Sequence, residues 1–461
     1  MIWRDLMLNN NYSLAYPLSE DELDQIHAET MKILAEEGIK LGHEKALEIC
    51  KKNNLKTEGN KVFLSSDKIE EALEKIPGSF TLKARNPRNN VEIGTNASVL
   101  GPALGPPFIM RDGEQEYASY EDYVKLLKLV QSSPYLDLIG GGMVPPTDLP
   151  EETRHRDMFY AAVKYGDKSL IAVGSGAKKS KECLEMAKIV LGKEKLNENY
   201  YLFNSIGVSS PLTYDAEPLE TLITWARSGQ PLGIYSQILA GMTGPITPAG
   251  TLTLQNAEIL AGAVLTQLIN PGIPVVYSSF SSATDMNTGK IKVGGAHYSE
   301  IIGATVQLAN YYDLPSRVGG GLTDAEQLGA QAGYESMLNM FTAVGYGADM
   351  IFFTLGSIKN YLGVSYEKVA ADMEILQAID NFQDPIEVNE KTLARDVIAE
   401  VGAGGNYMTH PQTLKQLENR KKVRDTVKLE SRKERIREIL TNYQQPDLKS
   451  EVEEKLLTYI E

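Results

Sequence analysis

Short apolar runs alternate with longer amphipathic segments through the middle of the chain. Eight runs rich in apolar or small residues occur between about residue 98 and residue 357, one every roughly 30 to 40 residues. Their length and bounding residues are typical of buried strands. The runs are 98–101, 136–141, 170–175, 201–208, 232–239, 274–281, 315–321 and 349–356.

The segments between these runs have the spacing of amphipathic helices, as at 120–131, 182–192, 217–227 and 256–269. Thr323 followed by Glu326 has the spacing of a capping box, which predicts a helix start there. Repeated strand-then-helix units predict an α/β fold, a (β/α)8 TIM barrel. A doubly wound open sheet of similar length is the structural alternative.

The flanking segments lack this alternation. Two amphipathic helices, 20–37 and 43–54, and short strands predict an N-terminal cap over residues 1–95. The barrel is expected to occupy residues 96–385. Residues 386–461 are charge-rich and helical in pattern, including the stretch 420–440, and predict a C-terminal helical extension that faces solvent or a partner.

Composition narrows the class of protein. Apolar residues make up 42% and charged residues 23% of the chain, as in a globular protein with a sizeable core. The net charge of −15 disfavours nucleic-acid binding, which depends on clustered Lys and Arg. The same charge would attract a cationic substrate, although acidic cytoplasmic proteins are common for other reasons.

Cysteine use and the first residues bear on localisation. Cys50 and Cys183 are too few for a disulfide framework, which favours a reducing compartment. The start lacks a basic region followed by an apolar one, and no stretch approaches 18 uninterrupted apolar residues. We therefore expect a cytoplasmic protein that is not attached to a membrane.

A barrel of this kind carries its site at the carboxyl ends of the strands, so the last residues of each run are the candidates. Many of them are aromatic, and a ring face attracts a quaternary ammonium by about 0.5 to 2 kcal/mol. Packing in the core is the alternative role for each ring. The candidate substrate-binding residues are Phe353, Tyr361, Tyr235, Gln237, Tyr277, Phe280, Arg317 and Gly320.

Two features at the same end could hold an anionic group. The loop 240–251 is rich in Gly and Pro and leads into a long helix, whose start offers free N–H groups. Arg317 could bind a carboxylate with two hydrogen bonds, or it could pair with Asp324 or Glu326. The long segment 282–300 is a candidate lid.

Familiar catalytic motifs do not fit the sequence. Residues 174–180 lack the spacing of a P-loop, and residues 401–406 lack the strand that precedes a dinucleotide fingerprint. No HExxH and no GxSxG is present. We therefore predict no catalytic acid or base and no metal site. The histidines are scattered, at His27, His43, His155, His297 and His410.

Several stretches together resemble the trimethylamine methyltransferase family of corrinoid-dependent methyltransferases. The clearest is GPITPAGTLTLQNAEILAGAVLTQLINPGIPVVYSSF at 244–280. The others follow the family's order along most of the chain. They are GPALGPPFIMRDGE (101–114), LPSRVGGGLTDAEQLGAQAGYESM (314–337), GADMIFFTLG (347–356), SYEKVAADME (365–374) and VIAEVGAGGNYMTHPQTL (397–414).

This resemblance implies a TIM barrel that binds a methylated amine at its mouth and passes a methyl group to Co(I) of a separate corrinoid protein. Family members that demethylate trimethylamine carry pyrrolysine, whereas this chain holds only the common residues. It therefore resembles the non-pyrrolysine branch and its glycine betaine methyltransferases. Glycine betaine, proline betaine, carnitine and γ-butyrobetaine are the expected substrates, and by alignment Phe353 and Tyr361 would contact them.

The same resemblance implies that the cobalamin is carried by the partner, with no cofactor bound tightly by this chain, and we also expect a homo-oligomer. A quaternary nitrogen is already a cationic leaving group, so positioning rather than proton transfer is the protein's task. Two alternatives remain. One is a metal-assisted barrel enzyme using Asp285, Asp324 and Glu335, and the other is a non-catalytic osmolyte-binding subunit.

Overall fold

A sheet of eight parallel strands forms the centre of the computed structural model, which describes residues 14–111, 113–420 and 429–460. The strand order is β6-β18-β17-β15-β13-β11-β10-β9. All eight predicted runs are strands of this sheet. Their bounds are β6 Val99–Leu100, β9 Leu138–Gly140, β10 Ser169–Ile171, β11 Leu202–Gly207, β13 Leu232–Ser236, β15 Val275–Ser279, β17 Ser316–Gly319 and β18 Met350–Phe352.

The two edge strands of this sheet, β6 and β9, meet and nearly close the barrel. The Asp137 N–H donates to the Leu100 carbonyl at 2.9 Å, and the Leu100 N–H donates to the Asp137 carboxylate at 2.7 Å. Burial raises the pKa of Asp137 to about 6, against the effect of the Leu100 hydrogen bond. The predicted (β/α)8 barrel is confirmed, and the open doubly wound sheet is excluded.

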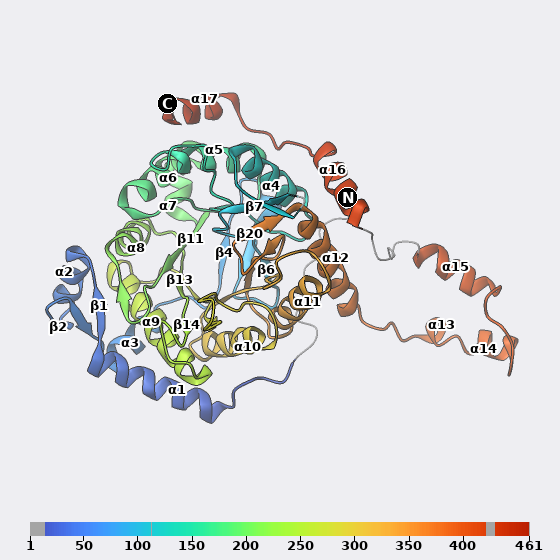
Figure 1. Cartoon of the computed structure of the whole chain (residues 1–461), viewed down its shortest axis with the longest axis horizontal. Coiled ribbons are helices and arrows are strands. Elements are labelled where there is room, and N and C mark those ends of the chain that lie inside the picture. Colours follow the sequence, from blue (N-terminus) through green and yellow to red (C-terminus); the bar gives the residue numbers. More distant parts are fainter. Residues whose placement is uncertain (1–13, 112, 421–428, 461) are drawn as a thin grey trace.

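A ring of helices surrounds the barrel, one after each strand (Figure 1). The longest, α9, is long and apolar enough to cross a membrane, but 83% of its most apolar stretch is buried inside the protein, as in a core helix. The helices are α4 Tyr120–Ser132, α5 Arg154–Tyr165, α6 Gly176–Leu191, α8 Ala216–Ser228, α9 Pro248–Ile269, α10 Ala296–Tyr311, α11 Ala330–Gly345 and α12 Tyr366–Gln383. Short α7, Lys193–Glu198, follows α6.

The N-terminal segment packs on the outside of this ring. Helix α1 starts at a capping box made by Ser19 and Glu22, continues into the π-helical turn η1, and runs across α9 (Figure 1). Asn256 of α9 donates to Thr30 and to Tyr312, which fixes α1 against the barrel helices. The elements are α1 Glu20–Lys32, η1 Ile33–Glu37, α2 Glu44–Lys52 and α3 Ser66–Leu73.

Two small sheets accompany this segment. Strands β1 to β3 form a sheet beside the ring, in which β1 also pairs with β12, whereas β4 and β5 form a hairpin at the amino ends of the barrel strands. There Ser169 donates its hydroxyl to the Leu82 carbonyl. The strands are β1 Ile39–Leu41, β2 Lys56–Glu58, β3 Lys61–Phe63, β4 Phe80–Leu82, β5 Val91–Ile93 and β12 Thr213–Tyr214, and the 3-10 turn η2 is Pro87–Asn89.

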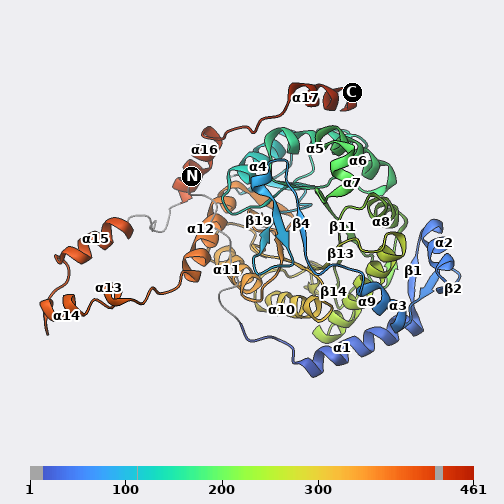
Figure 2. The same cartoon turned by 180° about the vertical axis from the view of Figure 1, so that it is seen from behind.

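The C-terminal helices leave the barrel and return to it. Helices α13, α14 and α15 stand off to one side, and α16 and α17 lie back on the ring (Figures 1 and 2). Residues 421–428 of the predicted helical stretch lie outside the described residues. The division at residues 95 and 385 stays a prediction. The helices are α13 Glu390–Leu393, α14 Arg395–Val401, α15 Pro411–Arg420, α16 Leu429–Thr441 and α17 Ser450–Ile460.

The predicted helix start at Thr323 is wrong. Helix α11 begins at Ala330, and residues 320–329 form an irregular loop. The Thr323 hydroxyl donates to the buried Glu335 carboxylate at 2.5 Å and accepts from the Ala325 N–H at 3.0 Å, but no helix starts there. A tertiary hydrogen bond therefore replaces the local cap that the sequence suggested.

Candidate active site

Small residues inside the barrel make room for large ones. A side-chain carbon at Gly233 of β13 would lie 2.8 Å from the Phe203 ring of β11, so only glycine fits opposite that ring. Tyr235, Ser278 and Arg317 are in register on three neighbouring strands. The parallel register therefore brings Arg317 and Tyr235 to the same level of the barrel interior.

The guanidinium of Arg317 is buried among four aromatic rings. It lies 4.8 Å from the centroid of Phe352 and 5.0 Å from that of Phe280, with Tyr235 and Phe203 within 5.9 Å. The side chain is 2% exposed. Burial lowers the pKa of Arg317 to about 10, so the group keeps its positive charge at neutral pH.

No carboxylate of the described residues pairs with this cation. Arg317 donates to the Ser205 hydroxyl, and its Nε has no partner among the described residues. The two expected acidic partners are engaged elsewhere. Asp324 accepts from Asn360 and from the Val293 N–H, and Glu326 pairs with lysines. The barrel interior therefore holds an uncompensated positive charge.

Four rings form a ring cluster: Tyr235, Phe280 and Phe353 at the ends of three barrel strands, and Tyr361 in the segment that follows β18. The Phe280 centroid lies 6.0 Å from that of Tyr235 and 5.1 Å from that of Phe353, and Phe353 lies 6.0 Å from Tyr361. Gln237 donates its amide to the Tyr361 hydroxyl. Six of the predicted residues, Arg317 and Gln237 included, thus come together at the barrel mouth.

The backbone that carries two of these rings is strained. Phe353 has a φ of 56°, and Lys359, Asn360 and Tyr361 have φ values of 57°, 54° and 58°. A residue other than glycine costs about 1–3 kcal/mol in this region. Asn360 fixes the turn by donating its amide to Asp324 at 2.6 Å and to the Ile291 carbonyl at 2.8 Å.

A small four-stranded sheet positions Tyr361, and we call it the cover sheet. Tyr361 lies in the turn between β19 and β20, and Lys359 of the same turn donates to Gln115 of β8 at 3.2 Å. The strand order is β19-β20-β7-β8, with β19 Ser357–Ile358, β20 Gly363–Ser365, β7 Phe108–Arg111 and β8 Glu114–Tyr117. The position of the ring thus depends on how this sheet is held.

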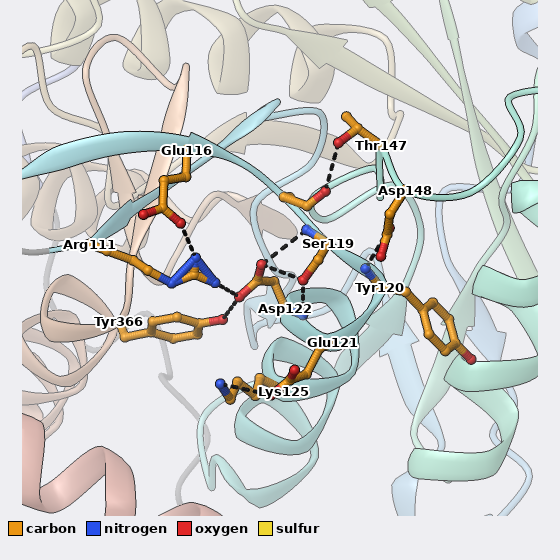
Figure 3. Close-up of polar contacts among 11 residues, drawn as sticks. Arg111, Glu116, Ser119, Tyr120, Glu121, Asp122, Lys125, Thr147, Asp148 and Tyr366 are labelled. Atoms are coloured by element: carbon orange, nitrogen blue, oxygen red, sulfur yellow. Dashed lines mark hydrogen bonds and ion pairs between the residues drawn. The ribbon is translucent and has the colours of Figure 1, made fainter.

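The buried carboxylate of Asp122 holds the cover sheet to the barrel helices (Figure 3). It accepts from Arg111 of β7, from the Tyr366 hydroxyl at the start of α12, and from the N–H and hydroxyl of Ser119. Burial opposes ionisation, but these hydrogen bonds outweigh it and hold the pKa of Asp122 below its usual value. One carboxylate therefore joins β7, α4 and α12.

Two predicted residues lie outside the ring cluster. The Tyr277 hydroxyl donates to Asn256 of α9 at 3.1 Å, so this ring is on the helix-facing side of β15. A side-chain carbon at Gly320 would meet Ile351 and Met340, whereas Gly319 is the glycine that faces Phe280. The start of α9, the other expected anion site, is exposed.

The prediction missed residues one layer below the mouth: Phe203, Ser205 and Phe352. Phe203 and Ser205 lie inside β11, and Phe352 ends β18 directly before the predicted Phe353, whereas the prediction considered the last residues of each run and the loops beyond them. Side chains alternate along a strand, so counting back two residues from each inward-facing end identifies them. The buried Tyr298 of α10, whose hydroxyl lies near Gly319, had no such signal in the sequence.

The carboxylates of the metal-assisted alternative do not converge. Asp285 accepts from backbone N–H groups in its own turn, while Glu335 accepts from Thr323 and from the Asp324 N–H. Within the described ranges, no three His, Cys, Asp or Glu side chains are grouped to hold a metal ion. The geometry therefore gives this alternative no ligand set.

A cavity of about 1260 Å³ opens at the opposite end of the barrel, lined by Val99, Asp137, Lys168 and Arg435 among others. The Lys168 ammonium there already donates to three backbone carbonyls. Barrel enzymes carry out their chemistry at the carboxyl ends of the strands, so the ring cluster, not this cavity, is the candidate site.

Comparison with known proteins assigns the family. A family model described as trimethylamine methyltransferase (MTTB) matches residues 4–461. The chain belongs to this family, as the sequence resemblance predicted, and it is an enzyme of the corrinoid methyltransferase class.

The chain is 39% identical to the glycine betaine methyltransferase of Desulfitobacterium hafniense (strain Y51) over 459 residues, 96% of each chain. It is 30% identical to the proline betaine:corrinoid methyltransferase of Eubacterium limosum over 408 residues, covering 85% of this chain and 83% of that one. A hydroxylamine complex of MtmB matches with a TM-score of 0.55 at 12% identity, covering 94% and 90%. This last similarity shows the fold.

We predict that Asp122→Asn loosens the cover sheet, because an amide oxygen cannot replace a carboxylate that accepts from four donors. The expected loss of unfolding free energy is about 1–3 kcal/mol. Hydrogen exchange should accelerate in residues 108–117 and 357–365. Glu116→Gln removes only the outer ion pair of Arg111 and should leave exchange there nearly unchanged. Equal exchange in D122N and wild type would contradict the assigned role.

Proposed function

We propose that this enzyme demethylates a quaternary amine that carries a carboxylate, with glycine betaine as the first candidate, and that a cognate corrinoid protein accepts the methyl group. The observation that carries the proposal is the unpaired charge of Arg317 beneath the ring cluster. The corrinoid belongs to the partner, and this chain needs no tightly bound cofactor of its own. Cys50 and Cys183 are free and buried, in keeping with the cytoplasmic location that we also propose.

Arg317 suits the carboxylate end of such a substrate. Burying a cation without a counter-ion costs free energy, and the four surrounding rings and one serine hydroxyl offset only part of that cost. A carboxylate would supply the missing charge and can bind both guanidinium nitrogens at once. Binding of a carboxylate would therefore offset the free-energy cost of burying the Arg317 cation without a counter-ion.

The ring cluster suits the ammonium end. Tyr235 and Phe280 contact both Arg317 and the other rings, so the two halves of the site are adjacent. Ring faces attract a trimethylammonium group, which cannot donate a hydrogen bond, and they exclude water from it. A zwitterion bound with its carboxylate on Arg317 would direct its ammonium toward the mouth.

The reaction needs neither a nucleophile nor a proton donor from this chain. The partner's reduced cobalt supplies the nucleophile, and the neutral amine leaves without a proton. The residues named here orient one N–CH3 bond outward and exclude water.

Exposed Met242, Ile246 and Met286, on the loops after β13 and β15, offer an apolar rim on which the partner can dock. The names of the two relatives agree with a betaine as substrate.

The decisive assay combines the purified enzyme, chemically reduced cobalamin and a panel of amines. Glycine betaine, proline betaine, carnitine, γ-butyrobetaine and trimethylamine are each added, and loss of the Co(I) absorbance is followed. We expect one carboxylated quaternary amine to react and trimethylamine to be inert. Reaction with trimethylamine alone, or with no amine in the panel, would refute the proposal.

Arg317→Met tests the carboxylate anchor. We expect the KM for the active betaine to rise roughly 30- to 1000-fold, corresponding to the 2–4 kcal/mol typical of a buried charge pair. The variant should be as stable as wild type or more so, because it removes an uncompensated buried charge. A destabilised variant with an unchanged KM would identify Arg317 as structural. Arg317→Lys, which keeps the charge, should lie between the two.

Phe353→Ala and Tyr361→Ala test the ring cluster. Each should lower kcat/KM about 2- to 30-fold, the worth of one cation–π contact of 0.5–2 kcal/mol. Tyr361→Phe keeps the ring and should retain most activity. Tyr277→Phe is the matched control, since its hydroxyl faces α9, and it should react at the wild-type rate. Wild-type kinetics in both alanine variants would remove these rings from the site.

A further inference from the structure

We infer that the hydroxyl of Tyr298 donates a hydrogen bond to the carboxylate of the substrate, beside Arg317, and so completes the anchor for the anionic end. This role rests on the proposed function. Tyr298 lies in the first turn of α10, and α10 packs against β17, the strand that carries Arg317. Its side chain is 1% exposed.

Gly319 of β17 makes room for the Tyr298 hydroxyl at the barrel mouth. A side-chain carbon at Gly319 would lie 2.5 Å from the hydroxyl oxygen and 3.4 Å from the Phe280 ring, so these two groups share the space in front of this glycine. Residues two apart on a strand face the same side, so Gly319 follows Arg317 one layer nearer the mouth. The hydroxyl therefore enters the interior one layer above the position of Arg317, beside a ring of the cluster.

The hydroxyl of Tyr298 has no hydrogen-bond partner among the described residues. Burial raises the pKa of Tyr298, and the effects of the Gly319 N–H and of the nearby Arg317 cation offset this rise only in part. The hydroxyl therefore keeps its proton at neutral pH, and the Gly319 N–H can only donate to it. Buried polar groups are nearly always paired in native proteins, so a buried donor without an acceptor indicates a binding role.

Two buried donors in the barrel interior lack an acceptor within the described ranges: the Nε of Arg317 and the hydroxyl of Tyr298. A carboxylate has about four lone-pair positions on its two oxygens, so one carboxylate can accept from both groups at once. The trimethylammonium end of a betaine has no lone pair and can accept from neither. The two donors therefore bind the anionic end of the zwitterion, while the rings bind its cationic end.

The second donor restricts the direction of the bound carboxylate. Arg317 alone would hold a carboxylate at several tilts, whereas a hydroxyl one layer above it removes the freedom to rotate about the guanidinium. The carboxylate is then fixed beneath Phe280, which is close to both donors. Orientation of this kind lowers the barrier of a displacement reaction, because the N–CH3 bond stays directed toward the mouth.

A purely structural tyrosine has partners within the protein. Tyr312, directly after α10, accepts a hydrogen bond from Asn256 at 2.7 Å, and its hydroxyl lies 3.1 Å from the Nδ1 of His27. Tyr312 is also buried, at 8% exposure. Removal of its hydroxyl breaks contacts of the fold, whereas removal of the Tyr298 hydroxyl breaks none that the described residues make. Tyr312→Phe is therefore the matched control for Tyr298→Phe.

Calorimetric titration of the full chain tests the role of Tyr298 without the corrinoid protein. The ligands are glycine betaine, its demethylated product dimethylglycine, and tetramethylammonium, which lacks a carboxylate. We expect Tyr298→Phe to raise the Kd of both carboxylated ligands about 10- to 100-fold, as for a lost hydrogen bond to a charged group, and to leave the weaker binding of tetramethylammonium unchanged.

The stability of the ligand-free variants distinguishes binding from folding. Tyr298→Phe should have a Tm equal to or above that of wild type, because it removes an unpaired buried hydroxyl. Tyr312→Phe should show the reverse pattern, a lower Tm with an unchanged Kd for glycine betaine.

Each contrary result has a separate meaning. Equal affinity of wild type and Tyr298→Phe for both carboxylated ligands would overturn the role of Tyr298 and leave the proposed function standing. An equal loss of affinity for tetramethylammonium would also overturn it, since the hydroxyl would then act on the ring cluster. A wild type that binds neither carboxylated ligand would overturn the proposed function together with this inference.

Discussion

The site depends on a positive charge that the fold buries without a counter-ion. Arg317 sits within the barrel among four rings, and no carboxylate of the described residues approaches it. The absence of a side chain at Gly233 leaves room for the Phe203 ring beside this charge, and the register of β13, β15 and β17 places Arg317 level with Tyr235. A buried cation without a counter-ion favours an anionic ligand, and ring faces above it favour a cationic group nearby, which is the basis of the proposed betaine site.

Precision at the mouth comes from tertiary contacts rather than from the local chain. Four residues with left-handed backbone carry or flank two of the rings, and all but Asn360 disfavour that conformation. Asn360 and the cover sheet impose it, and Asp122 in turn fixes the cover sheet. Connected polar contacts, which extend to helices α4 and α12, thus fix the positions of the rings at the barrel mouth.

The sequence predicted those features of the fold and of the site that follow from repeated units and from local residue patterns. Eight strands, the barrel and six residues of the mouth follow from run spacing and from the rule that strand ends meet at one face. Thr323 was misread because its hydroxyl has a partner twelve residues away, beyond any local pattern. Tyr277 and Gly320 were expected at the substrate site but lie outside the ring cluster, because strand register decides which side of the sheet each residue faces. Phe203, Ser205 and Phe352 were missed because they precede the residues that the prediction took as the strand ends.

The turn at Lys359, Asn360 and Tyr361 has a consequence for laboratory evolution. Glycine or asparagine would adopt these backbone angles at less cost, so replacing Tyr361 with glycine relieves strain while deleting a ring. A selection for heat resistance alone would therefore drift toward small residues here and, on the role proposed for Tyr361, lower kcat/KM. Variants recovered from such a library need a turnover screen before they are accepted as improved.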